Sequence, residues 1–371
     1  MPREICFPMR VAIIILLLFI LSCTSQTADT VKIGALLSLS GPAASYGQES
    51  QKGIDLAVEE INTKGGINGK QVEIIYEDDA TDSKKAVTAF NKLVEVDNVV
   101  ALIGGTWDFN YNAIAPLAEE KQITLITPQN VKTDGLTIND YTFLMRPEMR
   151  KIVWTLENHI KQKNIKRIAI VHYTSPFGEA ILQGLTDIMN RTNGTIVLDQ
   201  TYTQLGGNDF LTEAAKVKQS GAEAVFLDML DTDLATFLKR AKETELDVQF
   251  ISHGIVTTAL NNMELDHNLF QNMVYFDYDT PASQEFTKKY RAKYNKTPNY
   301  SASGAYDSMM ILAEALNSTS PENINEYLAA HKFSTINGEF TFKNNVIDTG
   351  EVFVQQVTPE GVETLERIIV H

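Results

Sequence analysis

The chain has 371 residues, of which 44% are hydrophobic and 21% charged, ordinary values for a globular protein long enough for about two domains. Its formal net charge of −15 at pH 7 argues against nucleic acids and anionic membrane surfaces as partners, because both require basic patches. The two cysteines, Cys6 and Cys23, precede the globular part and exclude a disulfide framework there.

The first residues have the features of an exported, lipid-anchored protein. Residues 11–21 (VAIIILLLFIL) form an apolar run behind Arg10 that is too short to span a bilayer comfortably but fits a signal peptide; a second methionine just upstream is an alternative start. The run ends Leu-Ser-Cys, which resembles a lipobox. We therefore expect a signal peptide at 1–22, lipidation of Cys23, a tether at 23–30 and an extracytoplasmic, membrane-anchored location. Plain cleavage nearby is the alternative.

Residues 31–105 predict a parallel α/β sheet. The predicted elements are strands at 31–37, 71–77 and 99–103 and a helix at 47–64. The helix shows apolar residues at mostly three- and four-residue spacing, and glycines follow it. Strands that alternate with helices form βαβ units, whose ligands bind beyond the carboxyl ends of the strands. Those ends lead into the loops at 38–46 and 104–109.

The same alternation continues, and from about residue 144 it starts a second series. The first series ends with a helix at 109–121 and a strand at 123–126. The second series comprises strands at 167–172, 195–202, 224–228, 248–251 and 274–278, with helices at 148–163, 209–219 and 234–244. Helices are then predicted at 283–294, 301–317 and 322–331, and strands at 352–357 and 364–369. One sheet holding both series would be improbably wide, which favours two lobes.

The order LSGP…YG…GIDLAVEEINTKGGINGK…YEDD closely resembles the amino-terminal lobe of type I periplasmic binding proteins, in the branched-chain amino acid and amide group. The resemblance implies an α/β fold of two Rossmann-like three-layer (αβα) lobes joined by a three-strand hinge. It places lobe one at 31–146 plus 277–341 and lobe two at 147–276 plus 342–371. The implied crossings between lobes lie near 145–147, 275–281 and 340–344.

The resemblance implies a solute-capture protein of an ABC importer. Such a protein is a monomer that works with an ABC permease, closes its lobes on a small ligand, and needs no metal and no cofactor. A sensing protein of the same fold that signals to a membrane receptor is an alternative, because the sequence does not separate the two roles. An exported hydrolase is a minor alternative. We assign no catalytic residue, since no Gly-x-Ser-x-Gly, P-loop or His-Glu-x-x-His motif is present and the six histidines lack metal-ligand spacing.

Six strand-to-helix loops are candidates for lining the cleft. Tyr46 matches the aromatic residue with which the family covers its ligand, and Phe177 lies where many relatives carry tyrosine. Trp107 is a third candidate wall, with core packing as an equal alternative. The remaining candidates from the loops of lobe one are polar: Ser40, Thr106, Gln129 and Asn130.

The charged candidates depart from the resembled family. Asp108 stands near the place of a family Ser/Thr that holds a ligand carboxylate; alternatively it caps a helix beginning at Phe109. Asp228 and Asp231 add negative charge from lobe two, and His253 or Gly254 replaces a family acidic residue that grips the ligand ammonium. The six loops contain no Arg or Lys. We therefore expect a ligand with an amine or amide end rather than an acidic one.

Overall fold

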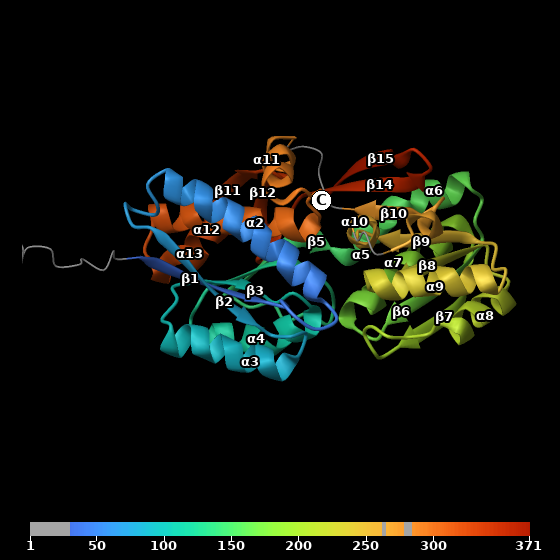
Figure 1. Ribbon diagram of the computed structural model, residues 1–371, viewed down its shortest axis with the longest axis horizontal. Helices are drawn as coiled ribbons and strands as arrows, with labels where there is room; N and C mark the ends of the chain where they lie inside the picture. The colour runs from blue at the N-terminus through green and yellow to red at the C-terminus, as the bar shows by residue number, and fades with distance from the viewer. Residues whose placement is uncertain (1–29, 262–264, 278–283) are drawn as a thin grey trace, which may run out of the picture.

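The computed structural model describes residues 30–261, 265–277 and 284–371. Figure 1 shows two α/β lobes side by side along the long axis, each with a central sheet between layers of helices. The predicted signal peptide at 1–22, Cys23 and all but the last residue of the tether lie outside the described residues.

Lobe one is built on an eight-stranded sheet of order β11-β12-β13-β5-β4-β3-β1-β2. Its strands are β1 Val31–Leu37, β2 Val72–Asp78, β3 Leu102–Gly104, β4 Leu125–Lys132, β5 Thr142–Glu148, β11 Lys332–Thr335, β12 Gly338–Lys343 and β13 Val346–Ile347. Six neighbouring strands pair in parallel, as the predicted βαβ units require: β2, β1, β3, β4, β5 and β13. The strands β12 and β11 continue the sheet beyond β13 with antiparallel pairing.

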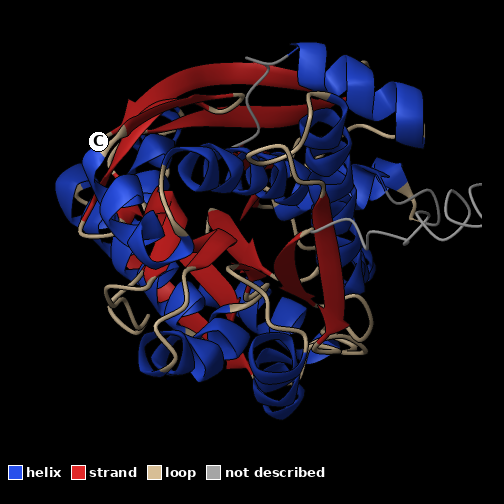
Figure 2. Cartoon of the chain, turned by 90° about the vertical axis from the view of Figure 1, so that its left-hand side faces the viewer, coloured by secondary structure: helices blue, strands red, loops and turns tan. Residues whose placement is uncertain are grey.

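Helices cover both faces of this sheet and enclose separate hydrophobic clusters. One face carries α2 Ala44–Thr63, α12 Tyr300–Ser318, α11 Gln284–Tyr294 and α13 Ile324–Ala330, and the other carries α3 Ser83–Asn91 and α4 Asp108–Glu120 (Figures 1 and 2). The helices α2 and α12 pack closely because Gly53 has no side chain: a Cβ there would lie 2.1 Å from the Ala302 carbonyl oxygen.

Lobe two has a seven-stranded sheet of order β15-β14-β10-β9-β8-β6-β7. Its strands are β6 Arg167–Tyr173, β7 Thr195–Tyr202, β8 Ala224–Asp228, β9 Gln249–His253, β10 Val274–Asp277, β14 Gly350–Thr358 and β15 Gly361–Val370. The last two form a long antiparallel hairpin along the top of Figure 1. Its helices are α5 Met149–Val153, α6 Glu157–Gln162, α7 Pro176–Thr192, α8 Leu211–Ser220, α9 Asp231–Glu243 and α10 Ile255–Asn261.

The chain passes between the two sheets three times. The first passage follows β5, and the second lies between β10 and α11, where residues 278–283 are outside the description. The predicted third passage at residues 340–344 is wrong. Those residues belong to β12 and its turn, and the pairing of β13 with β5 keeps the chain in lobe one until Ile347. The segment 342–347 therefore belongs to lobe one.

Candidate functional site

The loops at the carboxyl ends of the parallel strands of both lobes meet in the middle of the molecule. The backbone N–H of Phe177, at the start of α7, donates to Oδ2 of Asp108, at the start of α4, over 3.2 Å. At a second point a Cβ on Gly206 would lie 3.7 Å from the Cβ of Pro42. Because Phe177 and Gly206 belong to lobe two and their partners to lobe one, the structure shows the lobes closed on each other.

Asp108 is the residue through which α4 reaches lobe two. It is only 5% exposed, and its Oδ1 accepts the Phe109 N–H at 2.7 Å. Burial raises the pKa of its carboxyl, and the negative charge of Asp228 adds to the rise, while the hydrogen bonds from Phe177 and Phe109 oppose it. The alternative that Asp108 caps a helix starting at Phe109 is wrong. The helix begins at Asp108 itself, and Trp107 precedes it without a side-chain cap.

Aromatic rings line the lobe-one side of the meeting point. Tyr46 is 2% exposed, and its ring centroid lies 5.4 Å from that of Trp107, edge to face, and 6.2 Å from that of Tyr300. Tyr46 belongs to a hydrophobic cluster otherwise made almost wholly of lobe-two residues, and Trp107 packs against the same cluster. Trp107 therefore contacts this cluster and also stacks with Phe109 of its own helix, at a ring-centroid distance of 6.4 Å.

The lobe-two side carries a buried acid–imidazole pair. Nε2 of His253, the last residue of β9, lies 3.1 Å from Oδ1 of Asp228, the last residue of β8, and both are buried. The ring of Phe177 meets the His253 ring edge to face at 5.4 Å. Asp231 is buried in the first turn of α9, which begins three residues before the predicted start at 234.

The sequence predicted a loop for Gln129 and Asn130, and this prediction is wrong. They lie in β4, which is irregular between Thr127 and Val131 and then pairs with β5 again. Their amides serve lobe one: Nε2 of Gln129 donates to Oγ of Ser50 at 2.7 Å, and Nδ2 of Asn130 donates to the carbonyl of Gly105. An irregularity of this kind accommodates Pro128 within a strand.

Ser40 and Thr106 brace the neighbouring loops. The hydroxyl of Ser40 donates to Oδ2 of Asp78 at 2.5 Å, and Oγ1 of Thr106 accepts the backbone N–H of Ser38 at 3.0 Å. Both contacts lie within lobe one. Seven of the predicted site residues lie where the two lobes meet: Tyr46, Trp107, Asp108, Phe177, Asp228, Asp231 and His253. The other four, Ser40, Thr106, Gln129 and Asn130, make hydrogen bonds within lobe one.

The sequence analysis missed two residues at this site. Tyr300, the first residue of α12, contributes its ring, and Nη2 of the 4% exposed Arg146 in β5 donates to the Tyr300 carbonyl at 2.6 Å. Neither follows a strand in the way that marks the other candidates. Arg146 does stand within the predicted first crossing, and Tyr300 immediately precedes a predicted helix.

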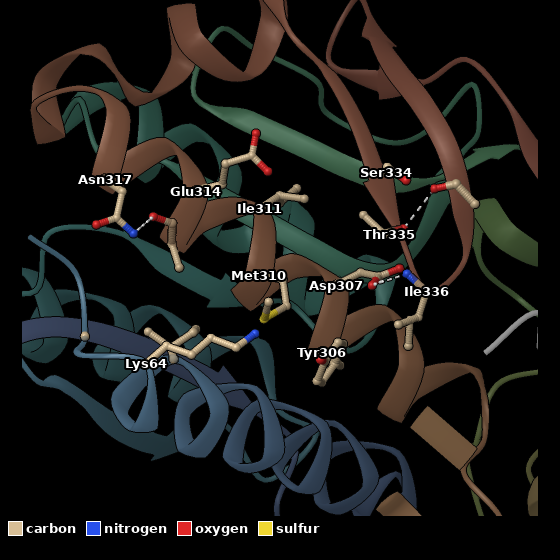
Figure 3. Close-up of a pocket in the computed structure, with 14 residues that line it drawn as sticks. Lys64, Tyr306, Asp307, Met310, Ile311, Glu314, Asn317, Ser334, Thr335 and Ile336 are labelled. Carbon is tan, nitrogen blue, oxygen red and sulfur yellow. Dashed lines mark hydrogen bonds between the residues drawn. The ribbon is translucent and has the colours of Figure 1, made fainter. Parts of the chain in front are cut away.

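A separate pocket of about 530 Å³ lies on lobe one, between α2, α12 and β11 (Figure 3). Its floor includes Met310, Ile311 and Tyr306. The buried carboxylate of Asp307 accepts the backbone N–H groups of Ile336 and of the residue after it, each at 3.2 Å, and so fixes the turn between β11 and β12. The residues that line this pocket include none of the candidates from the meeting loops.

Two kinds of feature are absent from the part of the chain that the structure describes. No group of three or more His, Cys, Asp or Glu side chains is arranged to hold a metal ion. No helix within these ranges combines the length and apolarity that crossing a membrane requires.

Comparison with known proteins gives consistent matches along almost the whole chain. The family model described as periplasmic binding protein matches residues 30–361. The Leu/Ile/Val-binding protein of Escherichia coli K12 is 27% identical over 328 residues, which cover 85% of this chain and 87% of that protein. A leucine-, isoleucine-, valine-, threonine- and alanine-binding protein of Pseudomonas aeruginosa is 25% identical over 335 residues, covering 86% and 87%.

Solved structures confirm the predicted fold class. The branched-chain amino acid transporter substrate binding protein of Streptococcus pneumoniae, in complex with isoleucine, has a TM-score of 0.81 at 23% identity and covers 92% of this chain and 99% of that one. An ABC transporter solute binding protein of R. palustris, in complex with benzoate, has a TM-score of 0.80 at 18% identity and covers 91% and 96%.

Proposed function

The chain belongs to the periplasmic binding protein family, and from that premise we propose that it captures an amino acid-like, amide or amine ligand between its lobes for an ABC importer. It is a substrate-binding protein of the branched-chain amino acid transporter type, and the family implies an extracytoplasmic location. Its homologues are solute-binding proteins rather than enzymes.

The observation that carries the proposal is the convergence of both lobes on one set of buried and half-buried side chains. Tyr46, Trp107 and Asp108 come from lobe one, and Asp228 and His253 from lobe two. A ligand that contacts both groups stabilises the closed form, since it binds that form better than a form with the lobes apart. The buried carboxylates and the lack of Lys or Arg in the six loops support an amine or amide end on the ligand.

The proposal includes the membrane anchor and the partner. The Leu-Ser-Cys sequence supports attachment of lipid to Cys23 after removal of residues 1–22, which would hold the two lobes near an ABC permease. Mass spectrometry of the protein from its own membranes tests the anchor: an unmodified amino terminus beyond Cys23 would contradict it.

Capture is tested by solution scattering and thermal unfolding with a broad panel of amines, amides and amino acids. A ligand present at a hundred times its Kd stabilises the folded protein by ~2.7 kcal/mol. We expect at least one compound to raise Tm and to reduce the radius of gyration. If no compound changes either quantity, the capture function is wrong.

A further inference from the structure

We propose that the ligand is a small organic cation that also carries a neutral oxygen acceptor, such as an aminoamide or amino alcohol, with its charged group held by carboxylates of both lobes. The inference rests on the proposed function and narrows it. It assigns the charge-binding role to Asp108 of lobe one and Asp228 of lobe two, and the covering role to Tyr46 and Trp107.

The first step concerns charge. Asp108, Asp228 and Asp231 are each 5% exposed, and the lobe contact brings the acid of α4 to lobe two through Phe177. Among the groups facing Asp228, His253 lies at 3.1 Å from it. The buried Arg146 donates to the Tyr300 carbonyl. Closure therefore gathers like charges from opposite lobes, which disfavours the closed state until a cation lies between them.

The second step concerns the rings. The ring centroid of Tyr46 lies 5.4 Å from that of Trp107 and 6.2 Å from that of Tyr300, and all three rings belong to or pack against one hydrophobic cluster made mostly of lobe-two residues. The faces of aromatic rings attract cations, most strongly where water is excluded. Rings and carboxylates together form the setting that an alkylammonium group needs, whereas a carboxylate beside Asp108 would be repelled.

The third step is independent of the charges. The hydroxyl of Tyr46 and Nε1–H of Trp107 are buried and make no hydrogen bond to any described residue. Burial raises the pKa of the Tyr46 hydroxyl, and Tyr300, Asp231 and Asp228 add to the rise. A buried polar group that lacks a hydrogen-bond partner destabilises the protein, because it has lost its bonds to water. A ligand ammonium donating to Tyr46 and a ligand oxygen accepting from Trp107 would remove both costs.

Matched ligands on two skeletons test the inference. The leucine set is leucinamide, leucine, 4-methylpentanamide and 4-methylpentanoate, and the glycine set is glycinamide, glycine, acetamide and acetate. Each set varies the ammonium and the carboxylate independently. Titration calorimetry is run below pH 7, where amines with a pKa of ~7.7–8.0 are protonated. We expect an aminoamide to bind at least about tenfold more tightly than both its neutral amide and its amino acid, which is ~1.4 kcal/mol.

Charge-neutral variants locate the effect. In Asp108→Asn and Asp228→Asn the advantage of the aminoamide over the neutral amide is expected to fall about tenfold, with folding checked by circular dichroism. The matched control is Asp247→Asn, which removes the same charge from an exposed position and should keep the wild-type ratio.

The inference is overturned if an amino acid or a carboxylate is the tightest ligand, if both variants keep the wild-type ratio, or if no member of either set binds. These results do not contradict the capture function if any compound of the broad panel compacts the protein. The capture function is contradicted only if no compound of that panel compacts it.

Discussion

Tyr46 is deeply buried, yet its hydroxyl makes no hydrogen bond within the described part of the chain. If the hydroxyl serves the ligand, Tyr46→Phe should weaken ligand binding about tenfold while Tm of the ligand-free protein stays the same or rises, since an unpaired buried hydroxyl is removed. Tyr46→Ala should weaken binding further, because it also removes a large apolar contact. Calorimetry and thermal unfolding of both variants provide the measurement. Equal affinities of wild type and Tyr46→Phe would show that the hydroxyl does not contact the ligand.

Asp108→Ser tests the residue at which this chain departs from the resembled family. The change removes the acceptor for the Phe177 N–H and the negative charge, but leaves a hydroxyl at the start of α4. We expect weaker binding of the natural ligand or a gain of binding to ordinary α-amino acids, because the positive end of the helix then accepts a carboxylate. Titration with leucine and valine measures the gain. Tight binding of leucine by the wild type, unchanged in Asp108→Ser, would contradict the assignment.

Asp307 gives a pH prediction away from the ligand. Burial raises the pKa of its carboxyl from 3.8 to about 6, against the hydrogen bonds that it accepts. Its contribution to stability is therefore fully present below pH 3.8 and is lost as pH rises toward 6, a change of about 3 kcal/mol. Urea unfolding should show the free energy of unfolding of wild type, relative to Asp307→Asn, falling over this range. A difference between wild type and Asp307→Asn that does not change with pH would contradict the raised pKa.

At the scale of single residues, the sequence predicted site residues that lie at the end of a strand or in the loop after it. Asp108, Asp228 and His253 were identifiable because a parallel sheet brings its carboxyl ends to one edge. Tyr300 was not, since it reaches the site from the start of a helix nearly two hundred positions after Trp107. Gln129 was misassigned because a proline after a short strand looks like a loop when pairing across an irregularity cannot be seen.

The pair α2 and α12 decides the stability of lobe one, since the two helices pack along each other over the first sheet. Gly53→Ala places a Cβ 2.1 Å from the Ala302 carbonyl oxygen, so the helices must separate. Despite the gain in helix propensity, we expect a loss of about 1–3 kcal/mol in the free energy of unfolding. The control is Gln219→Ala on the exposed face of α8, which should have little effect. Chemical denaturation of both variants measures the difference, and an unchanged Gly53→Ala would show that this contact is loose.

Whole elements were predictable where one periodicity dominates. Most of the parallel strands of both sheets and the long helices lie close to their predicted positions, because buried parallel strands are short apolar runs between turn residues. The strand β5 was not predicted. The predicted helix at 148–163 is instead α5, a 3₁₀ turn at Trp154–Leu156 and α6. The strands β11 to β13 were missed, because they are only two to six residues long and because β13 joins the sheet by pairing with the distant β5.

For the molecule as a whole, the proposed capture function requires each lobe to move as a unit about the three connections between the sheets. The closed arrangement is held by contacts between loops rather than by a shared core, apart from Tyr46 and its neighbours. Loop contacts of this size are weak enough for a ligand to decide between closed and separated lobes. The two lobes were predictable from the repeated α/β pattern, whereas the third passage was misplaced because β13 is only two residues long.

A disulfide across the mouth of the site tests this motion directly. The Cβ positions at Pro42 and Gly206 are 3.7 Å apart, within the ~3.5–4.5 Å range of disulfides. In a Cys23→Ser background, Pro42→Cys with Gly206→Cys should form the bond only when the lobes close, so ligand should speed its formation. Once formed, the bond should slow ligand release by at least about tenfold, because the ligand leaves only when the lobes separate. Stopped-flow measurement of ligand release before and after reduction of the disulfide gives the two rates.

Gly206→Cys alone is the control for the positive φ of +77° at that position. Release at the wild-type rate from the oxidised double variant would mean that the ligand does not bind between these loops.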